Sequence, residues 1–263
     1  PVRRQSEHRL DYLAALTSLQ DRALVYPCFC TRSEIKAAAA GVQHAAQSPD
    51  GGPIYPGTCR HLSNRERAAL TERGTAHAWR LDTSKAIAWL SNNRPGTTLS
   101  WREIGTGEGG ITWPAHSAAH TAAKYPADTL HGHTPHKASA AAFSYTLKSL
   151  PVHSYSDVVL ARKDIATSYP LSVVVDDGLQ AIPHVIRGHD LFTATPLHRL
   201  LQALFDLPEP MYHHHGLIPD LDGLKLAKSK GSKSLRDLRA EGLSPDDIRS
   251  AVNQAAKIMH SSF

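Results

Sequence analysis

The sequence has only three cysteines and no long apolar run among its 263 residues. No stretch approaches the roughly eighteen consecutive apolar residues of a membrane-spanning helix, so we expect no membrane association. The first ten residues lack the apolar core of a signal peptide, and an odd number of cysteines argues against a disulfide framework. We therefore expect a reducing compartment, the cytoplasm. The chain does not start with Met, and we expect it to begin inside a longer gene product.

The composition allows a sizeable core, because 41% of the residues are hydrophobic. A chain of this length can form one large domain or two smaller ones. The net charge is +5 and the sequence pI is about 9.2. A mildly basic balance suits a polyanionic partner such as a nucleotide or a nucleic acid, although many basic proteins bind neither.

The first 150 residues contain a few regular patterns. Residues 6–24 predict a helix whose apolar face carries Leu10, Leu13, Leu16, Leu19 and Leu24. Thr31 and Glu34 form a capping-box pattern that opens a second helix. Residues 77–82 alternate as in a strand. Residues 84–150 are rich in Ala, His, Thr, Gly and Pro and resemble a long insertion.

From residue 157 the pattern changes to short β-branched runs. Residues 157–164, 171–177 and 184–191 are typical of buried strands in an α/β sheet. Residues 195–205 predict a helix with Thr195 as N-cap and one apolar face, formed by Leu197, Leu200, Leu201 and Leu204. Two short helices are expected near the end, opened by Ser234 and Ser244.

A lysine-rich loop precedes these two helices, with Lys225, Lys228 and Ser229 in a Gly-flanked segment. Ammonium groups at this spacing suit a polyphosphate, because they offset the charge that builds on a leaving pyrophosphate. A solvated surface loop is the alternative interpretation of the same residues.

The three cysteines are a second candidate site. Cys28 and Cys30 can present two thiolates to one tetrahedral ion, and Cys59 lies beyond a loop that can fold back. Three thiolates leave one ligand to find, and His61 is a candidate. The alternative is three unrelated buried thiols. The histidines of residues 116–136 are typical of a solvated loop, whereas residues 213–215 lie in a strand-like run.

The order of these runs, ending in Lys225–Ser229, resembles the second half of the catalytic domain of class I glutamyl- and glutaminyl-tRNA synthetases. The spacing C-x-C and then Y-x-x-x-C resembles the short glutamyl-Q tRNA(Asp) synthetases. The resemblance implies an α/β fold: a Rossmann-like parallel sheet whose first segment is missing, with a small zinc-binding insertion. It covers about residues 5–238, apart from residues 84–150.

The expected organisation has five parts. A remnant of the first Rossmann half occupies residues 1–26, and a zinc-binding insertion that faces the polynucleotide occupies 27–83. The low-complexity insertion spans 84–150, the second Rossmann half 151–220, and the lysine loop with the last helices 221–263.

The resemblance also implies roles for single residues. Tyr169 and Arg187 match positions that hold glutamate. A guanidinium can clamp a carboxylate through two hydrogen bonds, and a phenol can donate one. Without the resemblance, Tyr169 would be an ordinary core tyrosine and Arg187 the partner of Asp177 or Asp190. We expect no catalytic role for Asp176 or Asp177, which would point to opposite faces of a strand.

The remaining matches concern ATP and zinc. Lys225, Lys228 and Ser229 would bind ATP, with Lys228 as the catalytic cation beside magnesium. A structural zinc would be held by Cys28, Cys30, Cys59 and, by the family pattern, Tyr55.

The resemblance implies a ligase that activates glutamate with ATP and transfers it to tRNA, to the queuosine of tRNA(Asp), as a monomer. A fragment of a glutamate–tRNA ligase is one alternative. The non-enzymatic alternatives are a zinc-containing RNA-binding remnant and a zinc-stabilised interaction domain. The family's ATP motif and its R-x-E-D segment should lie before residue 5, where this sequence has neither. We therefore expect little or no aminoacylation by residues 1–263 alone.

Overall fold

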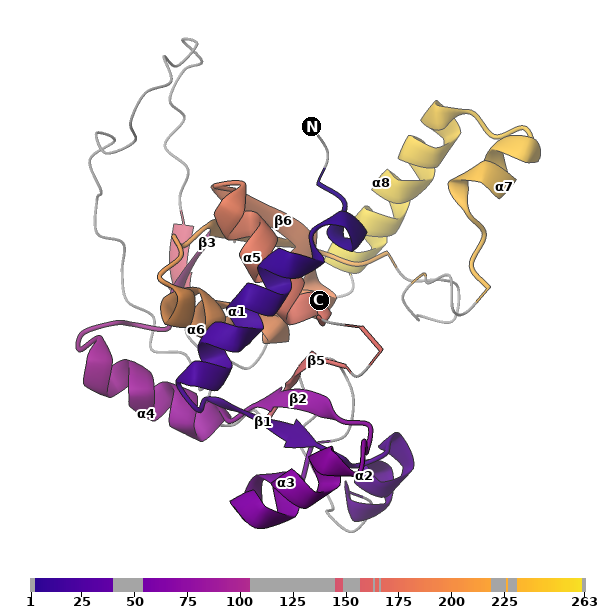
Figure 1. The fold of residues 1–263 in the computed structure, drawn as a ribbon. Helices are drawn as coiled ribbons and strands as arrows, with labels where there is room; N and C mark the ends of the chain where they lie inside the picture. Colours follow the sequence, from indigo (N-terminus) through magenta and orange to yellow (C-terminus); the bar gives the residue numbers. More distant parts are fainter. Residues whose placement is uncertain are drawn as a thin grey trace.

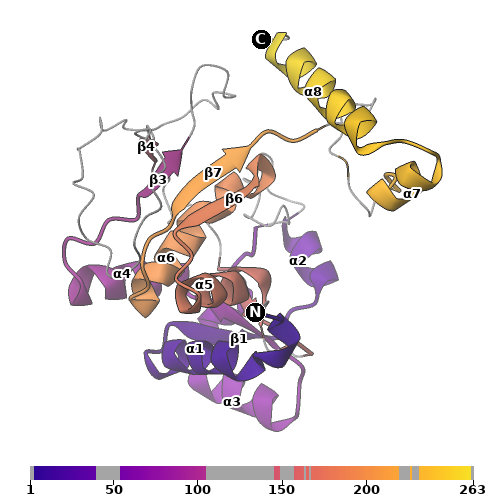
Figure 2. The same ribbon diagram turned by 90° about the horizontal axis from the view of Figure 1, so that it is seen from above.

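The computed structural model describes residues 3–39, 54–104, 145–148, 157–162, 164–165, 167–218, 226 and 231–261. Within these ranges the chain forms two small sheets with helices around and between them (Figures 1 and 2). No helix in this part of the chain is long and apolar enough to cross a bilayer.

The first sheet, sheet A, is antiparallel and has the strand order β1-β2-β5. Its strands are β1 (Val25–Cys28), β2 (Ala78–Leu81) and β5 (Val159–Ala161). Strand β2 confirms the strand expected at residues 77–82. Between β1 and β2 the chain forms α2 (Arg32–Ala39), the short 3-10 helix η2 (Thr58–His61) and α3 (Asn64–Glu72).

The second sheet, sheet B, is mixed and has the order β4-β3-β7-β6. Its strands are β3 (Trp101–Ile104), β4 (Tyr145–Lys148), β6 (His184–Gly188) and β7 (Met211–His215). Strand β7 runs parallel to both β3 and β6, whereas β4 is antiparallel to β3. The α/β prediction is confirmed at this coarse level, with parallel pairing confined to sheet B.

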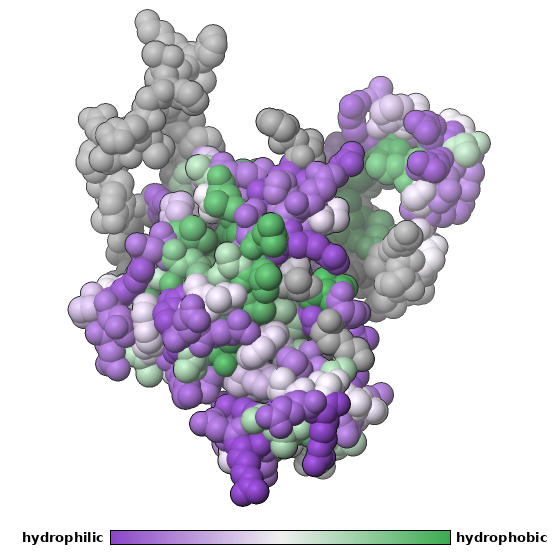
Figure 3. All heavy atoms as spheres, viewed as in Figure 1, coloured by the Kyte–Doolittle hydropathy of each residue, from purple (hydrophilic) through white to green (hydrophobic). Residues whose placement is uncertain are grey.

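The main core lies between sheet A and four helices. These are α1 (Arg9–Asp21), α4 (Thr83–Asn93), α5 (Tyr169–Leu179) and α6 (Thr195–Phe205). On the face seen in Figure 3, apolar residues gather in the middle, where these helices lie, and hydrophilic residues cover the end around α2 and α3.

Helix α6 lies at the centre of the molecule, and every residue from Thr195 to Leu204 is buried. The expected apolar stripe of Leu197, Leu200, Leu201 and Leu204 packs into the main core. The opposite, polar stripe reaches sheet B, where Gln202 Nε2 donates to the Tyr212 hydroxyl at 2.9 Å. Helix α6 therefore joins the core to sheet B.

Helix α5 corrects the sequence analysis, which expected a strand at residues 171–177. The buried residues Leu171, Val174 and Val175 follow helical spacing, i, i+3 and i+4, and pack into the core. Burial of this face outweighs the weak strand preference of the three consecutive valines. Pro170 lies in the first turn of α5, where a backbone N–H needs no partner within the helix.

Helix α1 was expected, but its apolar face is different. Leu16 and Leu19 are buried together with Tyr12, whereas Leu10 and Leu13 are 79% and 47% exposed. Tyr12 takes the place of the leucines because its hydroxyl donates to Asp176 on α5, at 2.8 Å from one carboxylate oxygen.

The structure also differs from the insertion expected at residues 84–150. Helix α4 and strand β3 occupy part of that segment, and Trp101 is fully buried. Residues 105–144 and 149–156 lie outside the described ranges. The other division points of the chain remain predictions.

The end of the chain forms α7 (Leu235–Ala240) and α8 (Pro245–Ser261), which stand apart from the two sheets in Figure 2. Ser234 forms the expected capping interaction, since its side chain accepts from the N–H of Asp237. Helix α8 is longer than the sequence analysis expected.

Replacing Asp176 by Asn should destabilise the fold, because this carboxylate joins α5 to the N-terminal segment. It accepts hydrogen bonds from Tyr12, from Gln5 at 3.0 Å and from Arg3 at 2.5 Å. The loss of charge and of acceptor capacity should cost about 1–3 kcal/mol in urea unfolding. The exposed Asp246→Asn variant should stay within about 0.5 kcal/mol of the wild type. An equal loss of stability in both variants would show that Asp176 does not stabilise the fold by joining α5 to the N-terminal segment.

Candidate functional site

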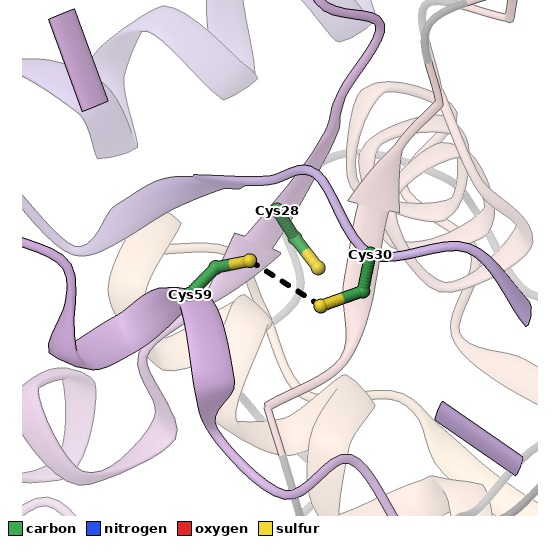
Figure 4. A group of neighbouring side chains, drawn as sticks. All are labelled: Cys28, Cys30 and Cys59. Carbon is green, nitrogen blue, oxygen red and sulfur yellow. Dashed lines mark hydrogen bonds between the residues drawn. The ribbon is translucent and has the colours of Figure 1, made fainter. Parts of the chain in front are cut away.

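Two groups of side chains stand out, and the first is the cysteine cluster shown in Figure 4. Strand β1 ends at Cys28, Cys30 follows it, and Cys59 lies in η2. The three sulfurs lie within 4.8 Å of one another, and those of Cys30 and Cys59 are 3.4 Å apart. Thiolates around a tetrahedral zinc ion lie about 3.8 Å apart. The donor set therefore fits a metal ion.

Tyr55 is next to this cluster. Its hydroxyl lies 3.8 Å from the sulfur of Cys30 and accepts a hydrogen bond from the N–H of Cys59 at 2.7 Å. The guanidinium of Arg80 covers its ring at 3.9 Å from the centroid. His61 is exposed and is not part of the group that could hold a metal ion. The geometry favours Tyr55 over His61 as a fourth donor.

Burial also governs the ionisation of the free thiols. It raises the pKa of Cys30 to about 12, and the neighbouring Cys59 adds to this effect. Burial opposes ionisation of Cys59 too, but hydrogen bonds from Tyr55 and from the N–H of Phe29 lower the pKa of that thiol. The pKa values of Cys30 and Cys59 are therefore shifted in opposite directions, and a bound cation would favour both as thiolates.

The second group surrounds Arg187 on strand β6, whose side chain is buried. Its Nε donates to His214 Nε2 at 2.9 Å, and its Nη1 donates to His198 Nδ1 at 2.8 Å. Its Nη2 donates to the Thr195 hydroxyl at 2.7 Å and to the carbonyl of Leu191 at 3.2 Å. These bonds use four of the five N–H groups of a guanidinium.

The strand register explains why these groups meet. Arg187 lies opposite His214 in the β6–β7 pair, so the two side chains are neighbours on one face of the sheet. Helix α6 presents Thr195 and His198 at i and i+3 to the same face. The Tyr212 ring, 5.1 Å from the guanidinium carbon, adds a cation–π contact.

Tyr169 also lies beside His198. It begins helix α5, is 49% exposed, and its ring centroid is 5.8 Å from that of His198. The structure therefore brings Tyr169 and Arg187 to the same histidine. One N–H of the buried guanidinium has no hydrogen-bond partner among the described residues, and the phenol of Tyr169 is open to solvent.

Comparison with known proteins identifies the family of the chain. A family model described as the catalytic domain of class I tRNA synthetases (E and Q) matches residues 138–257. A "Glutamyl-Q tRNA(Asp) synthetase" of Rhodobacter capsulatus is 39% identical over 253 residues, which cover 96% of this chain and 75% of that protein. The chain belongs to the class I tRNA synthetases of the E and Q group.

Two further relatives in this ligase family have lower sequence identity to the chain. A protein of the same name from Nocardia farcinica is 34% identical over 94% of this chain, and the match covers 61% of its own length. The next relative, from Symbiobacterium thermophilum, is 30% identical and 59% covered, so the chain spans about three fifths of both. A crystal structure of a glutamate tRNA ligase from Elizabethkingia meningosepticum is 21% identical, with a TM-score of 0.49 over 88% of this chain and 38% of that one. The family assignment rests on the sequence relatives.

The structure describes only some of the residues that were expected to bind glutamate and ATP. Lys225, Lys228 and Ser229 lie outside the described residues. Arg187 donates to His214, His198, Thr195 and Leu191 rather than to Asp177 or Asp190, the partners considered without the family. Thr195 is the first residue of α6 and not its N-cap, because its hydroxyl contacts Arg187.

Sequence reasoning missed Glu103 and His198 altogether. Glu103 was hidden in the segment interpreted as an insertion, and His198 in a helix that was recognised only by its leucines. The signal that could have found His198 is the second stripe of α6, where Thr195, His198, Arg199 and Gln202 follow helical spacing.

A cavity of about 610 Å³ is lined by residues of β1, η2, α3 and the start of α4. Its lining includes Arg60, Arg67 and Lys85. Arg60 lies 3.3 Å from Asp157, and Arg67 donates to the carbonyl of Arg60 at 2.6 Å. Two of its three cations are therefore engaged within the protein.

Asp177 should make stability depend on pH. Burial raises its pKa to about 6, and repulsion from Asp176 adds to this, while Arg187 opposes it. The folded state thus disfavours the ionised carboxylate of Asp177. The contribution of this group to the free energy of unfolding is therefore fully present below about pH 4 and is lost as the pH rises through 6. Asp177→Asn should therefore be more stable than the wild type by about 1–3 kcal/mol at pH 8 and equal to it at pH 4. Urea unfolding between pH 4 and 8 measures this, and a difference that is constant over that range would contradict it.

Proposed function

We propose that the whole protein activates glutamate with ATP and transfers the glutamyl group to tRNA, with the queuosine of tRNA(Asp) as acceptor. The observation that carries this proposal is the Arg187 guanidinium, which four hydrogen bonds hold in one plane and which contacts the same histidine, His198, as the ring of Tyr169. The names of the relatives from Rhodobacter and Nocardia support the choice of acceptor.

Arg187 and Tyr169 would bind a carboxylate between them. A buried guanidinium is a strong donor to a carboxylate, and a half-exposed phenol can add a second hydrogen bond from the solvent side. Because four N–H groups of Arg187 are engaged, a single N–H is left for the substrate. The contact would therefore use one hydrogen bond, instead of the two expected from the sequence.

The reaction would have two steps. A glutamate carboxylate oxygen attacks the α-phosphorus of ATP, the bond to the β-phosphate bridge breaks, and glutamyl-adenylate and pyrophosphate form. Lys228 and Lys225 would offset charge on the leaving pyrophosphate, and magnesium bound with ATP would share this charge. A hydroxyl of the tRNA then attacks the acyl carbon and releases AMP.

Glutamate-dependent ATP–pyrophosphate exchange by the full-length protein tests the first step. Tyr169→Phe removes the phenol's hydrogen bond and should raise the glutamate KM about fivefold to tenfold while kcat changes little. Exchange that is equally fast with aspartate or glutamine, or no exchange with glutamate, would refute the activity.

A glutamate–tRNA ligase is the second candidate, because a relative from Alkalilimnicola ehrlichii named "Glutamate--tRNA ligase 2" is 30% identical over 97% of this chain. The acceptor separates the two. Our proposal requires transfer to tRNA(Asp) that contains queuosine and no transfer to tRNA(Asp) from cells that lack queuosine. Transfer to tRNA(Glu) alone would establish the ligase.

We further propose that the cysteine cluster holds one structural zinc ion, with Cys28, Cys30, Cys59 and Tyr55 as ligands. The sulfurs already lie within 4.8 Å of one another, and the Tyr55 oxygen is 3.8 Å from Cys30. In a tetrahedral site this sulfur–oxygen separation is about 3.5 Å. The ion would tie strand β1 to η2, and so the insertion to sheet A.

The zinc content of purified variants tests this site. Cys59→Ser should reduce bound zinc from about one equivalent to less than about 0.2, because a weaker ligand replaces a thiolate. Tyr55→Phe should bind zinc more weakly, which titration with a chelator measures, whereas His61→Ala should match the wild type. Full zinc content in Cys59→Ser would exclude the site, and loss in His61→Ala alone would make His61 the fourth ligand.

A further inference from the structure

Glu103 has a buried carboxylate, and the imidazole of His214 lies between this carboxylate and the guanidinium of Arg187. Its side chain is only 3% exposed, and it extends from β3 toward β7. It accepts from Trp101 Nε1 at 3.0 Å, from the N–H of His214 at 2.9 Å and from His214 Nδ1 at 3.0 Å. Although burial alone would raise the pKa of Glu103, the hydrogen bonds of His214 and Trp101 hold it below the ordinary value.

The hydrogen bonds around His214 have only one consistent direction. A guanidinium has no acceptor, so the bond between Arg187 Nε and His214 Nε2 requires the histidine nitrogen to accept. The proton of a neutral His214 is then on Nδ1, which donates to Glu103. Glu103 therefore fixes the tautomer that Arg187 needs.

His198 meets Arg187 in the same way. Its Nδ1 accepts from Arg187 Nη1 at 2.8 Å, which leaves the proton on Nε2. Burial, with a smaller effect of Arg187, lowers the pKa of His198 to about 3, so the ring is neutral at physiological pH. Two neutral imidazoles thus accept hydrogen bonds from two of the three guanidinium nitrogens.

We propose that Glu103, acting through His214, and His198 are positioning residues that fix the plane of the Arg187 guanidinium for the carboxylate of glutamate. The inference rests on the proposed function. Glu103 and His198 come from β3 and α6, so the orientation of one strand β6 side chain depends on two distant segments.

Glu103→Gln should release this arrangement. The new amide keeps one oxygen that can accept from His214 Nδ1, but its NH₂ then faces either the N–H of Trp101 or the backbone N–H of His214. One donor would lose its acceptor and the carboxylate charge would be lost, so His214, and with it the plane of the guanidinium, would be less firmly fixed. In the full-length protein the glutamate KM in pyrophosphate exchange should rise about tenfold, while kcat and the ATP KM stay within about twofold.

Two comparisons separate positioning from a structural role. Glu7→Gln makes the same chemical change at an exposed site and should leave all three constants unchanged. His198→Asn keeps an oxygen acceptor where Nδ1 lies, whereas His198→Leu removes it. The glutamate KM of the Leu variant should exceed that of the Asn variant at least about threefold. A structural role would instead lower kcat or the folded fraction in every variant.

The outcomes distinguish the proposed activity from the positioning of Arg187. A wild-type protein without glutamate-dependent exchange overturns the proposed function, and the positioning of Arg187 for glutamate falls with it. An active wild type whose glutamate KM is unchanged in Glu103→Gln overturns the positioning alone. Should Glu103→Gln fail to fold, equal glutamate KM values for His198→Asn and His198→Leu overturn it.

Discussion

A buried cation governs the arrangement of sheet B. The guanidinium of Arg187 cannot lose its charge at physiological pH, so a protein that removes it from water must supply acceptors or lose several kcal/mol. The acceptors are His214, Thr195, His198 and the carbonyl of Leu191. They come from β7, α6 and the short helix η4 (His189–Ala194), and each of these elements must be in place before the charge is satisfied.

The balancing negative charge is not in direct contact with that cation. Glu103 is separated from Arg187 by the imidazole of His214, which donates on one side and accepts on the other. An ion pair in direct contact would neutralise the guanidinium and leave little attraction for another carboxylate. With a neutral ring between them, Arg187 keeps a field that an incoming carboxylate can use, while the carboxylate of Glu103 offsets the cost of burial. In the proposed function, the stability of the fold and the binding of a carboxylate would therefore both depend on the charges of Arg187 and Glu103.

The sequence predicted the elements that depend on local pattern and missed those that depend on tertiary contacts. The leucine stripe of α6 and the cap at Ser234 follow from spacing alone, and both are found. The run of valines in α5 resembled a strand because β-branched residues prefer strands, and only its packing against α1 and α6 makes it a helix. The spacing of Cys28, Cys30 and Cys59 predicted a cluster that the fold does assemble. Glu103 was out of reach, since its role depends on a β3–β7 pairing between residues more than a hundred positions apart.

Helix α6 connects the main core with the hydrogen bonds of sheet B. Its leucines belong to the main core, and its Thr195, His198 and Gln202 face the aromatic and polar side chains of sheet B. A shift of the helix that improved one interface would displace the other, because interiors are close-packed and hydrogen bonds are directional. The main core therefore fixes the position of the histidine that holds Arg187. A substitution at Leu200, which is fully buried in the main core, should therefore also displace His198 and the Arg187 guanidinium that it holds.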